Sequence, residues 1–235
     1  MTEITTEDRV QIRNWIVQSA FGLVVYGVLL FLAAGSLRWG WGWVMLAVIG
    51  AFLAAHPLIL IPINPALLVE RERGMLDKGV KRWDKWLTPL SALMMPLSWF
   101  IAGLDYRLGW SARMPLILPL VGLAANLLGF GLFLWAMRCN AFFAEGVRVQ
   151  EERGHRVISD GPYRWVRHPG YAGAILAQFG MPFLLGSPWA LIPSLFFAVG
   201  YILRTALEDR TLVRELPGYE EYTHKTRYRL LPWVW

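Results

Sequence analysis

Residues 161–185 read GPYRWVRHPGYAGAILAQFGMPFLL and join a polar, basic turn to an apolar run without a charged side chain. Pro169 suits the first position of a helix, because the N–H that proline lacks would be unpaired there anyway. The amides and the positive dipole end of such a helix attract an anionic group. Gly170 and Gly173 leave one face of its first turn bare, so a flat ligand could approach the backbone. A second interpretation is structural: the arginines set the topology and His168 caps the helix.

The rest of the sequence is as apolar as this helix. Hydrophobic residues make up 56% of the 235 residues and the mean hydropathy is +0.40, above the roughly 45–50% of soluble domains. Six apolar blocks follow one another: 16–34, 41–61, 87–104, 114–137, 171–185 and 188–203. Three of them reach the roughly 20 residues that a spanning helix needs. We therefore predict an all-α integral membrane protein with about six transmembrane or membrane-embedded helices.

The basic residues are divided unevenly between the loops. In the six-helix arrangement, alternate compartments hold 20 and 3 of the 23 Lys and Arg residues, which places both termini in the cytoplasm. The net charge of +6 is explained by this topology and requires no nucleic-acid partner. The start, MTEITTEDRV, lacks the basic region of a cleaved signal peptide, so we expect the first block to remain as a helix.

We predict one structural domain, with helices 1–4 in residues 1–137 and the functional part in 138–235. Val147 and Val149 alternate with polar residues, and 155–158 is a second extended candidate, so a small cytoplasmic cap is expected between helices 4 and 5. The connection 62–86 is either a solvated loop near the headgroups or a lid over a site. His56, inside helix 2, is either a functional residue or a structural one beside Pro57.

Two charged residues mark the cytoplasmic end of the last helix. Arg204 and Glu208 are four residues apart and so share a helix face. They form either an ordinary ion pair, which the spacing alone favours, or part of a ligand site, toward which the cost of keeping charge at membrane depth shifts the balance. Metal-ligand spacing, Rossmann and P-loop motifs are absent from the sequence, and the single Cys139 allows no internal disulfide.

The segments GPYRWVRHPGYAG, R-x-x-x-E-D at 204–209 and LPGYEEYTHKTRYRLLP, in this order, resemble the isoprenylcysteine carboxyl methyltransferase family and the related phospholipid N-methyltransferases. The resemblance covers roughly residues 138–232. It implies a membrane enzyme that uses S-adenosylmethionine (SAM), a lipid or lipid-linked substrate and a site that faces the cytoplasm. It further implies that Arg204 binds the substrate carboxylate, that Glu208 binds SAM, and that both act in catalysis. The other cofactor-binding positions that it implies are Gln150, His155, Arg156, Val157, Ile158, Tyr163, His168, Pro169, Gly170 and Tyr171. The role of Asp209 stays open.

The chemistry of the acceptor separates the enzymatic alternatives. A carboxylate is ionised at neutral pH and needs no general base, whereas an amine must first lose a proton. Arg204 offers a cationic anchor, which favours carboxyl O-methylation of a prenylcysteine-like or other lipid-linked acceptor. N-methylation of an ethanolamine phospholipid is the main alternative. A sterol-reductase-like enzyme and a non-enzymatic membrane protein are minor ones.

Overall fold

The computed structural model describes residues 5–77, 79–112 and 114–235, and this part of the chain is helical without a β-strand. The α-helices are α1 (Thr6–Ala34), α2 (Gly40–Ile63), α3 (Pro65–Arg73), α4 (Asp84–Ala92), α5 (Met94–Leu108), α6 (Ile117–Cys139), α7 (Pro169–Leu185), α8 (Leu191–Glu215) and α9 (Tyr219–Lys225). Short 3₁₀ turns are η1 (Gly74–Leu76), η2 (Glu151–Arg153), η3 (Gly161–Arg164) and η4 (Pro188–Ala190). The predicted all-α fold is confirmed.

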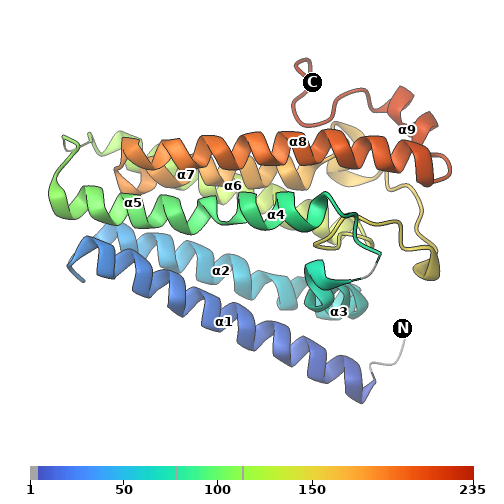
Figure 1. Cartoon of the computed structure of the whole chain (residues 1–235), viewed down its shortest axis with the longest axis horizontal. Helices are drawn as coiled ribbons and strands as arrows, with labels where there is room; N and C mark the ends of the chain where they lie inside the picture. Colours follow the sequence, from blue (N-terminus) through green and yellow to red (C-terminus); the bar gives the residue numbers. More distant parts are fainter. Residues whose placement is uncertain (1–4, 78, 113) are drawn as a thin grey trace.

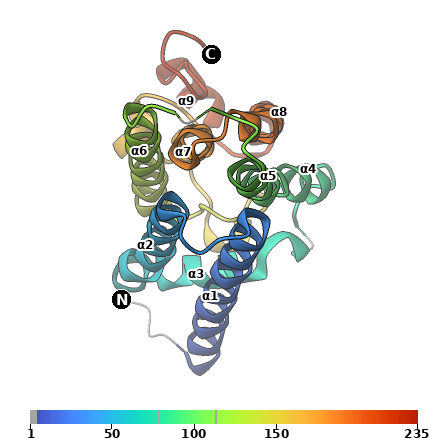
Figure 2. The same cartoon turned by 90° about the vertical axis from the view of Figure 1, so that its left-hand side faces the viewer.

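Among the described residues, five helical segments are long and apolar enough to cross a membrane. They are α1, α2, α4 with α5, α6, and η4 with α8. The sixth predicted segment, α7, has 17 residues and lies between α6 and α8 in the bundle (Figures 1 and 2). The protein is therefore a multi-pass integral membrane protein. The last helix continues beyond the apolar block to Glu215, so its final turns carry polar side chains out of the apolar region.

Local sequence explains where several helices begin and end. Thr5 caps α1 by accepting a hydrogen bond from the Asp8 backbone N–H at 3.1 Å, and the Asp8 carboxylate accepts one from the Thr5 N–H at 2.9 Å. Gly35 ends α1 with a φ of 63°, which glycine adopts without strain. The break between α4 and α5 falls at Leu93, where Pro96 lacks the N–H that would continue the hydrogen-bond ladder.

Glycines bring α6 and α7 into backbone contact. A Cβ atom at Gly129 would lie 2.5 Å from the carbonyl oxygen of Gly173, and one at Gly173 would lie 2.5 Å from that of Gly129. Close approach at small residues lets membrane helices pack through backbone contacts. The expectation that Gly173 leaves a face open for a ligand was therefore wrong, because α6 occupies that face. Gly170 is covered by the ring of Phe143.

The polar segments lie together at one end of the bundle. Figure 1 shows α3, the 140–168 region and α9 at the end where α2, α6 and α8 finish and where α4 and α7 begin. Within the connection 62–86, α3 buries Leu67 and Leu68 in a cluster with Ile12 and Trp15 of α1.

The 140–168 region forms the predicted cap, but the predicted pair of extended segments forms no hairpin ladder. Residues 147–150 and 155–158 have no strand pairing, and the turn between them is closed by the His155 N–H, which donates to the Gln150 carbonyl at 3.2 Å. Val147 instead bonds to the segment before α4, since the Lys81 N–H donates to its carbonyl at 3.0 Å.

Candidate functional site

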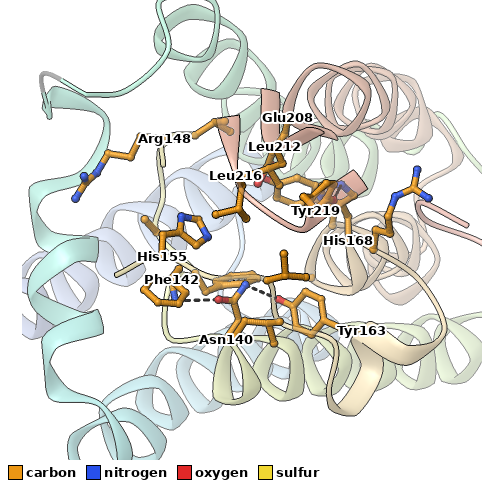
Figure 3. Close-up of a pocket in the computed structure, with 18 of the residues that line it drawn as sticks. Asn140, Phe142, Arg148, His155, Tyr163, His168, Glu208, Leu212, Leu216 and Tyr219 are labelled. Carbon is orange, nitrogen blue, oxygen red and sulfur yellow. Dashed lines mark hydrogen bonds between the residues drawn. The ribbon is translucent and has the colours of Figure 1, made fainter. Parts of the chain in front are cut away.

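A cavity lies where the cap, the start of α7, the end of α8 and α9 meet (Figure 3). It holds about 790 Å³ of atom-free space, part of it open to solvent. Its lining residues come from four parts of the chain. They are Asn140, Phe142, Phe143, Ala144, Gly146, Val147, Arg148, His155, Arg156, Val157, Ile158, Tyr163, Arg167, His168, Gly170, Tyr171, Arg204, Glu208, Leu212, Leu216, Tyr219 and Tyr222.

Asp209 organises the polar wall beneath the cavity. Its carboxylate accepts two hydrogen bonds from Arg167, from Nε and Nη2, both at 2.8 Å. Arg229 Nε donates to it at 2.8 Å and the Tyr219 hydroxyl at 3.0 Å, while His168 Nε2 lies 3.2 Å from Oδ1. Because Arg167 and His168 come directly before α7, Asp209 joins the start of α7 to α8 and to the C-terminal segment. This answers the question that the sequence left open about Asp209.

The charge of Asp209 affects the groups that surround it. Burial alone would lower the pKa of Arg167, but hydrogen bonds to Asp209 and its charge raise it above the usual value. Burial raises the pKa of Tyr219 well above its ordinary range, and the charges of Asp209 and Glu208 add to the effect. Tyr219 is therefore a neutral hydroxyl donor at any physiological pH.

Glu208 and Arg204 lie one turn apart on α8 and both line the cavity. The Tyr171 hydroxyl donates to Glu208 Oε2 at 2.5 Å, and no cation pairs with Glu208 among the described residues. Arg204 does not pair with Glu208: its Nε and Nη2 donate to Asp84 at 2.8 and 3.0 Å. The predicted shared face is present, but the ordinary ion pair within α8 is replaced by a pair with α4.

The opposite wall is aromatic and apolar. The rings of Phe142 and His155 stack with centroids 4.4 Å apart, and Val157, Ile158 and Tyr163 also line the cavity. Burial lowers the pKa of His155 to about 4, and the charges of Arg153 and Arg148 act in the same direction. Its ring is therefore neutral near pH 7, with Nδ1 accepting the Gln150 backbone N–H at 3.2 Å.

The backbone beside this wall has unused hydrogen-bonding groups. Within the described chain, the backbone N–H and C=O groups of 156–158 have no hydrogen-bond partner. Polar backbone groups at a cavity normally find a partner in water or in a ligand. The segment can therefore recognise the edge of a flat polar ligand through main-chain groups.

Most of the residues that the sequence predicted for the site meet at this cavity. The lining includes His155, Arg156, Val157, Ile158, Tyr163, His168, Gly170, Tyr171, Arg204 and Glu208. Gln150 and Pro169 do not line it. The Gln150 amide is buried, donating to the Phe142 carbonyl at 2.9 Å and accepting from Arg153 at 2.5 Å, so it supports the cap from inside. Pro169 is buried at the start of α7.

His168 and His56 have different surroundings. The side chain of His168 makes no capping hydrogen bond to α7 and is directed to Asp209, which excludes the helix-cap interpretation. His56 Nδ1 lies 2.8 Å from the Phe52 carbonyl, and its ring packs against Trp15, Phe52 and Phe133 away from the cavity. The structural interpretation of His56 is the one that the structure supports.

Groups of histidine, cysteine and acidic residues suited to a metal ion are absent from the part of the chain that the structure describes.

Several residues at the site carried no individual signal in the sequence. Asn140, whose side-chain amide donates to the Tyr163 hydroxyl at 3.1 Å, is a single amide at a helix end. Phe142 and Leu216 look like ordinary apolar residues. Asp84 lies 120 residues before Arg204, in a connection with many charges. Only the LPGYEEY motif pointed to Tyr219 and Tyr222.

The fold and the cavity define a multi-pass membrane protein with a polar ligand site at one end of its bundle. Residues 123–214 match the model of the isoprenylcysteine carboxyl methyltransferase (ICMT) family. This match supports the family resemblance that the motifs predicted, over that part of the chain.

Two curated relatives are similar to part of the chain. Both are described as a probable protein-S-isoprenylcysteine O-methyltransferase, one from Oryza sativa subsp. indica and one from Oryza sativa subsp. japonica. Each is 28% identical over 85 residues, which is 35% of this chain and 44% of the relative. The matched region thus spans less than half the length of these relatives.

The fold as a whole is similar to a solved structure. The structure of the eukaryotic intramembrane Ras methyltransferase ICMT superposes with a TM-score of 0.55 at 18% sequence identity, over 92% of this chain and 75% of the other. The likeness at this identity concerns the fold, which extends well beyond the region of sequence similarity.

Proposed function

We propose that this protein is a SAM-dependent methyltransferase that methylates the carboxylate of a prenylcysteine-like or other lipid-linked acceptor. One observation carries the proposal. A carboxylate without a cationic partner in the described chain, Glu208, lies one helical turn from Arg204 in one cavity at the end of a membrane bundle. The family match and the names of the relatives support the same activity.

The lining residues fit the charged cofactor. SAM would supply an electrophilic methyl group on a sulfonium. Glu208 is the only carboxylate among the described lining residues and would bind a cationic part of the cofactor. The unpaired backbone of 156–158 and the stacked rings of Phe142 and His155 suit an adenine. Proximity and the exclusion of water are the main requirements of such a displacement.

The acceptor side of the site is basic. An acceptor carboxylate requires no general base, since a terminal α-carboxyl ordinarily has a pKa of about 3.5 and is ionised at neutral pH. Arg204 would orient it, and burial of Arg204 at 5% exposure strengthens that contact by excluding water. The Tyr171 ring packs under the Arg204 guanidinium at 5.0 Å while its hydroxyl bonds Glu208, so one side chain keeps the two charged groups at a fixed spacing.

A groove on the outside of α4 and α8 supports a lipid-linked acceptor. These two helices also carry Asp84 and Arg204, so an alkyl chain in the groove would lie close to the cavity. The groove is lined by Trp83, Trp86, Leu87, Leu90, Leu203, Ala206, Leu207 and Arg210.

Methyl transfer from labelled SAM tests the proposal. Purified protein in lipid vesicles would be given S-prenylcysteine in one reaction and a phosphatidylethanolamine in another. We expect label in the prenylcysteine product, with release of methanol in mild alkali, because a methyl ester hydrolyses there and a methylated amine does not. Label only in the phospholipid would instead favour N-methylation, and no label in either would contradict a methyltransferase of this kind.

We further propose that the site end of the bundle faces the cytoplasm, on the basis of the distribution of the basic residues. In a Cys139→Ala background, a cysteine at exposed Glu220 in α9 and one at exposed Leu37 in the α1–α2 turn lie at opposite ends of the bundle (Figure 1). A membrane-impermeant thiol reagent added to sealed membrane vesicles with the cytoplasmic face outward should label Glu220→Cys but not Leu37→Cys. The reverse pattern would contradict the proposed orientation.

A further inference from the structure

We propose that Asp84 is a positioning residue for the acceptor: it fixes Arg204 so that one edge of the guanidinium meets the anionic group. The inference rests on the proposed function, because the anion on Arg204 belongs to the acceptor. It assigns a role in the site to α4, a helix that lies outside the segment that matches the family model.

All the hydrogen-bond acceptor positions of the Asp84 carboxylate are occupied by groups of the protein. Oδ1 accepts hydrogen bonds from Arg204 Nε at 2.8 Å and from the Thr88 hydroxyl at 2.6 Å. Oδ2 accepts from Arg204 Nη2 at 3.0 Å and from the Val147 backbone N–H at 2.7 Å. A carboxylate offers about four such acceptor positions, and the side chain is 0% exposed. Asp84 is therefore held rigidly and has nothing left to offer a ligand.

Arg204 is fixed on three sides by these contacts. One edge of its guanidinium, Nε with Nη2, pairs with Asp84, and Nη2 also donates to the Glu145 carbonyl. Its charge lies 5.0 Å from the ring centroid of Tyr171 and 5.9 Å from that of Tyr201. Nη1 makes no hydrogen bond with the described residues, and Arg204 lines the cavity. Nη1 is thus the donor group that an acceptor anion would meet.

The opposite charges of Asp84 and Arg204 determine how a substitution at Asp84 would affect binding and turnover of the acceptor. Asp84 neutralises Arg204, so the pair attracts an anion through directed hydrogen bonds more than through net charge. Asparagine at this position would remove the compensating charge but keep an acceptor for the Val147 N–H. The attraction for an anion would then persist or increase, while the guanidinium would lose its fixed orientation. Turnover depends on that orientation more steeply than binding does.

The test measures binding and chemistry separately on Asp84→Asn. Equilibrium binding of S-prenylcysteine would be measured with S-adenosylhomocysteine present, and the methyl-transfer rate in a single turnover with saturating SAM. We expect acceptor affinity equal to or tighter than that of the wild type, and a rate lower by about tenfold to a hundredfold, the scale of a small misplacement of the reacting group.

Two further variants separate positioning from stability. Thr88→Val keeps the shape and the Asp84 charge but removes one hydrogen bond to Oδ1, so we expect a smaller rate loss, of about threefold, with unchanged acceptor affinity. The control is Asp105→Asn. Asp105 is also a buried carboxylate, hydrogen-bonded to Ser111 at 2.9 and 2.8 Å, but it lies at the other end of the same spanning segment. It should lower thermal stability without changing the rate per folded molecule.

The possible results are distinct. A rate per folded molecule that is unchanged in both Asp84→Asn and Thr88→Val would overturn the positioning role, and so would a loss of acceptor affinity equal to the loss of rate. If the wild type methylates only phosphatidylethanolamine, the proposed carboxyl methylation fails. The same two measurements with that phospholipid then decide the role of Asp84, since Arg204 would hold its phosphate.

Discussion

Two neighbouring carboxylates on α8, Glu208 and Asp209, lie in opposite surroundings. Asp209 is 3% exposed and bonds to Arg167, Arg229, Tyr219 and His168. Glu208 faces the cavity, and the hydroxyl of Tyr171 is its hydrogen-bond partner in the described chain. The first arrangement satisfies every oxygen with the protein's own groups, and the second leaves capacity for a ligand. The Asp209 carboxylate is thus occupied by structural contacts, whereas the Glu208 carboxylate is available to a ligand.

The largest expected effect is on the Asp209 side of this comparison. Asp209→Asn would leave buried Arg167 without its anion, and removal of one partner from a buried ion pair costs about 3–5 kcal/mol. We expect a large drop in the thermal unfolding temperature of the detergent-solubilised protein, with loss of SAM binding as a consequence. The control is Asp160→Asn, because that carboxylate is 83% exposed and 3.7 Å from Arg164, so its loss should change stability little. Equal stability of the two variants would show that the Asp209 cluster does not hold the site together.

A smaller and more selective effect is expected at Glu208. Glu208→Gln should weaken SAM binding by about 1.5–3 kcal/mol, the scale of a hydrogen bond to a charged group, while the unfolding temperature stays close to that of the wild type. Titration calorimetry with SAM measures the first quantity. Glu215→Gln is a suitable control, because Glu215 pairs with Lys81 at 2.7 Å and lies outside the cavity. Unaltered SAM affinity in folded Glu208→Gln would place Glu208 with the structural carboxylates.

The smallest expected effect is a pH dependence that comes from His155. Its pKa is lowered to about 4 in the folded protein by burial and by Arg153 and Arg148, while an unfolded histidine has a pKa of about 6.5. Between these values the unfolded state binds more protons, so this group's contribution to stability is complete above about pH 6.5 and is lost as the pH falls toward 4.

His155→Gln removes the titrating ring and should therefore make the stability of the folded protein less dependent on pH. Thermal unfolding of the wild type and the variant at pH 7, 5.5 and 4.5 would be compared, since other groups titrate equally in both proteins. We expect the difference in unfolding temperature between the two to shrink or reverse as the pH falls. A difference that is constant with pH would show that His155 is not held neutral by the cap.

Much of the fold could be predicted because the signal is local. Each apolar block became helical, with 87–104 divided between α4 and α5, and the proline and glycine positions marked several helix ends, such as Pro169 and Gly35. The i, i+4 spacing placed Arg204 and Glu208 on one face, as in the structure. The two segments predicted to be extended form no paired strands, because alternation in a short segment also occurs in an irregular loop. The residues of 155–158 nevertheless line the cavity, with the backbone groups of 156–158 unpaired.

The prediction for Gly173 failed for another reason. A bare helix face suits a flat ligand and a second helix equally well, and only the position of α6 chooses between them. Gln150 was assigned from the motif alone, while the actual turn at 150–154 directs its amide into the cap.

The sequence by itself therefore determined the membrane class, the order of the helices and the resemblance to a family, because hydropathy, turn residues and motif order are properties of short segments. Tertiary structure alone decided that Arg204 pairs with Asp84 rather than Glu208, that Asp209 is structural, and that α4 reaches the site. The physical reason is that a helix surrounded by lipid is apolar on nearly every side, so its sequence does not mark the face that meets a neighbouring helix. The rotation of each helix, and with it the partner of each buried charge, follows from packing between segments up to 120 residues apart.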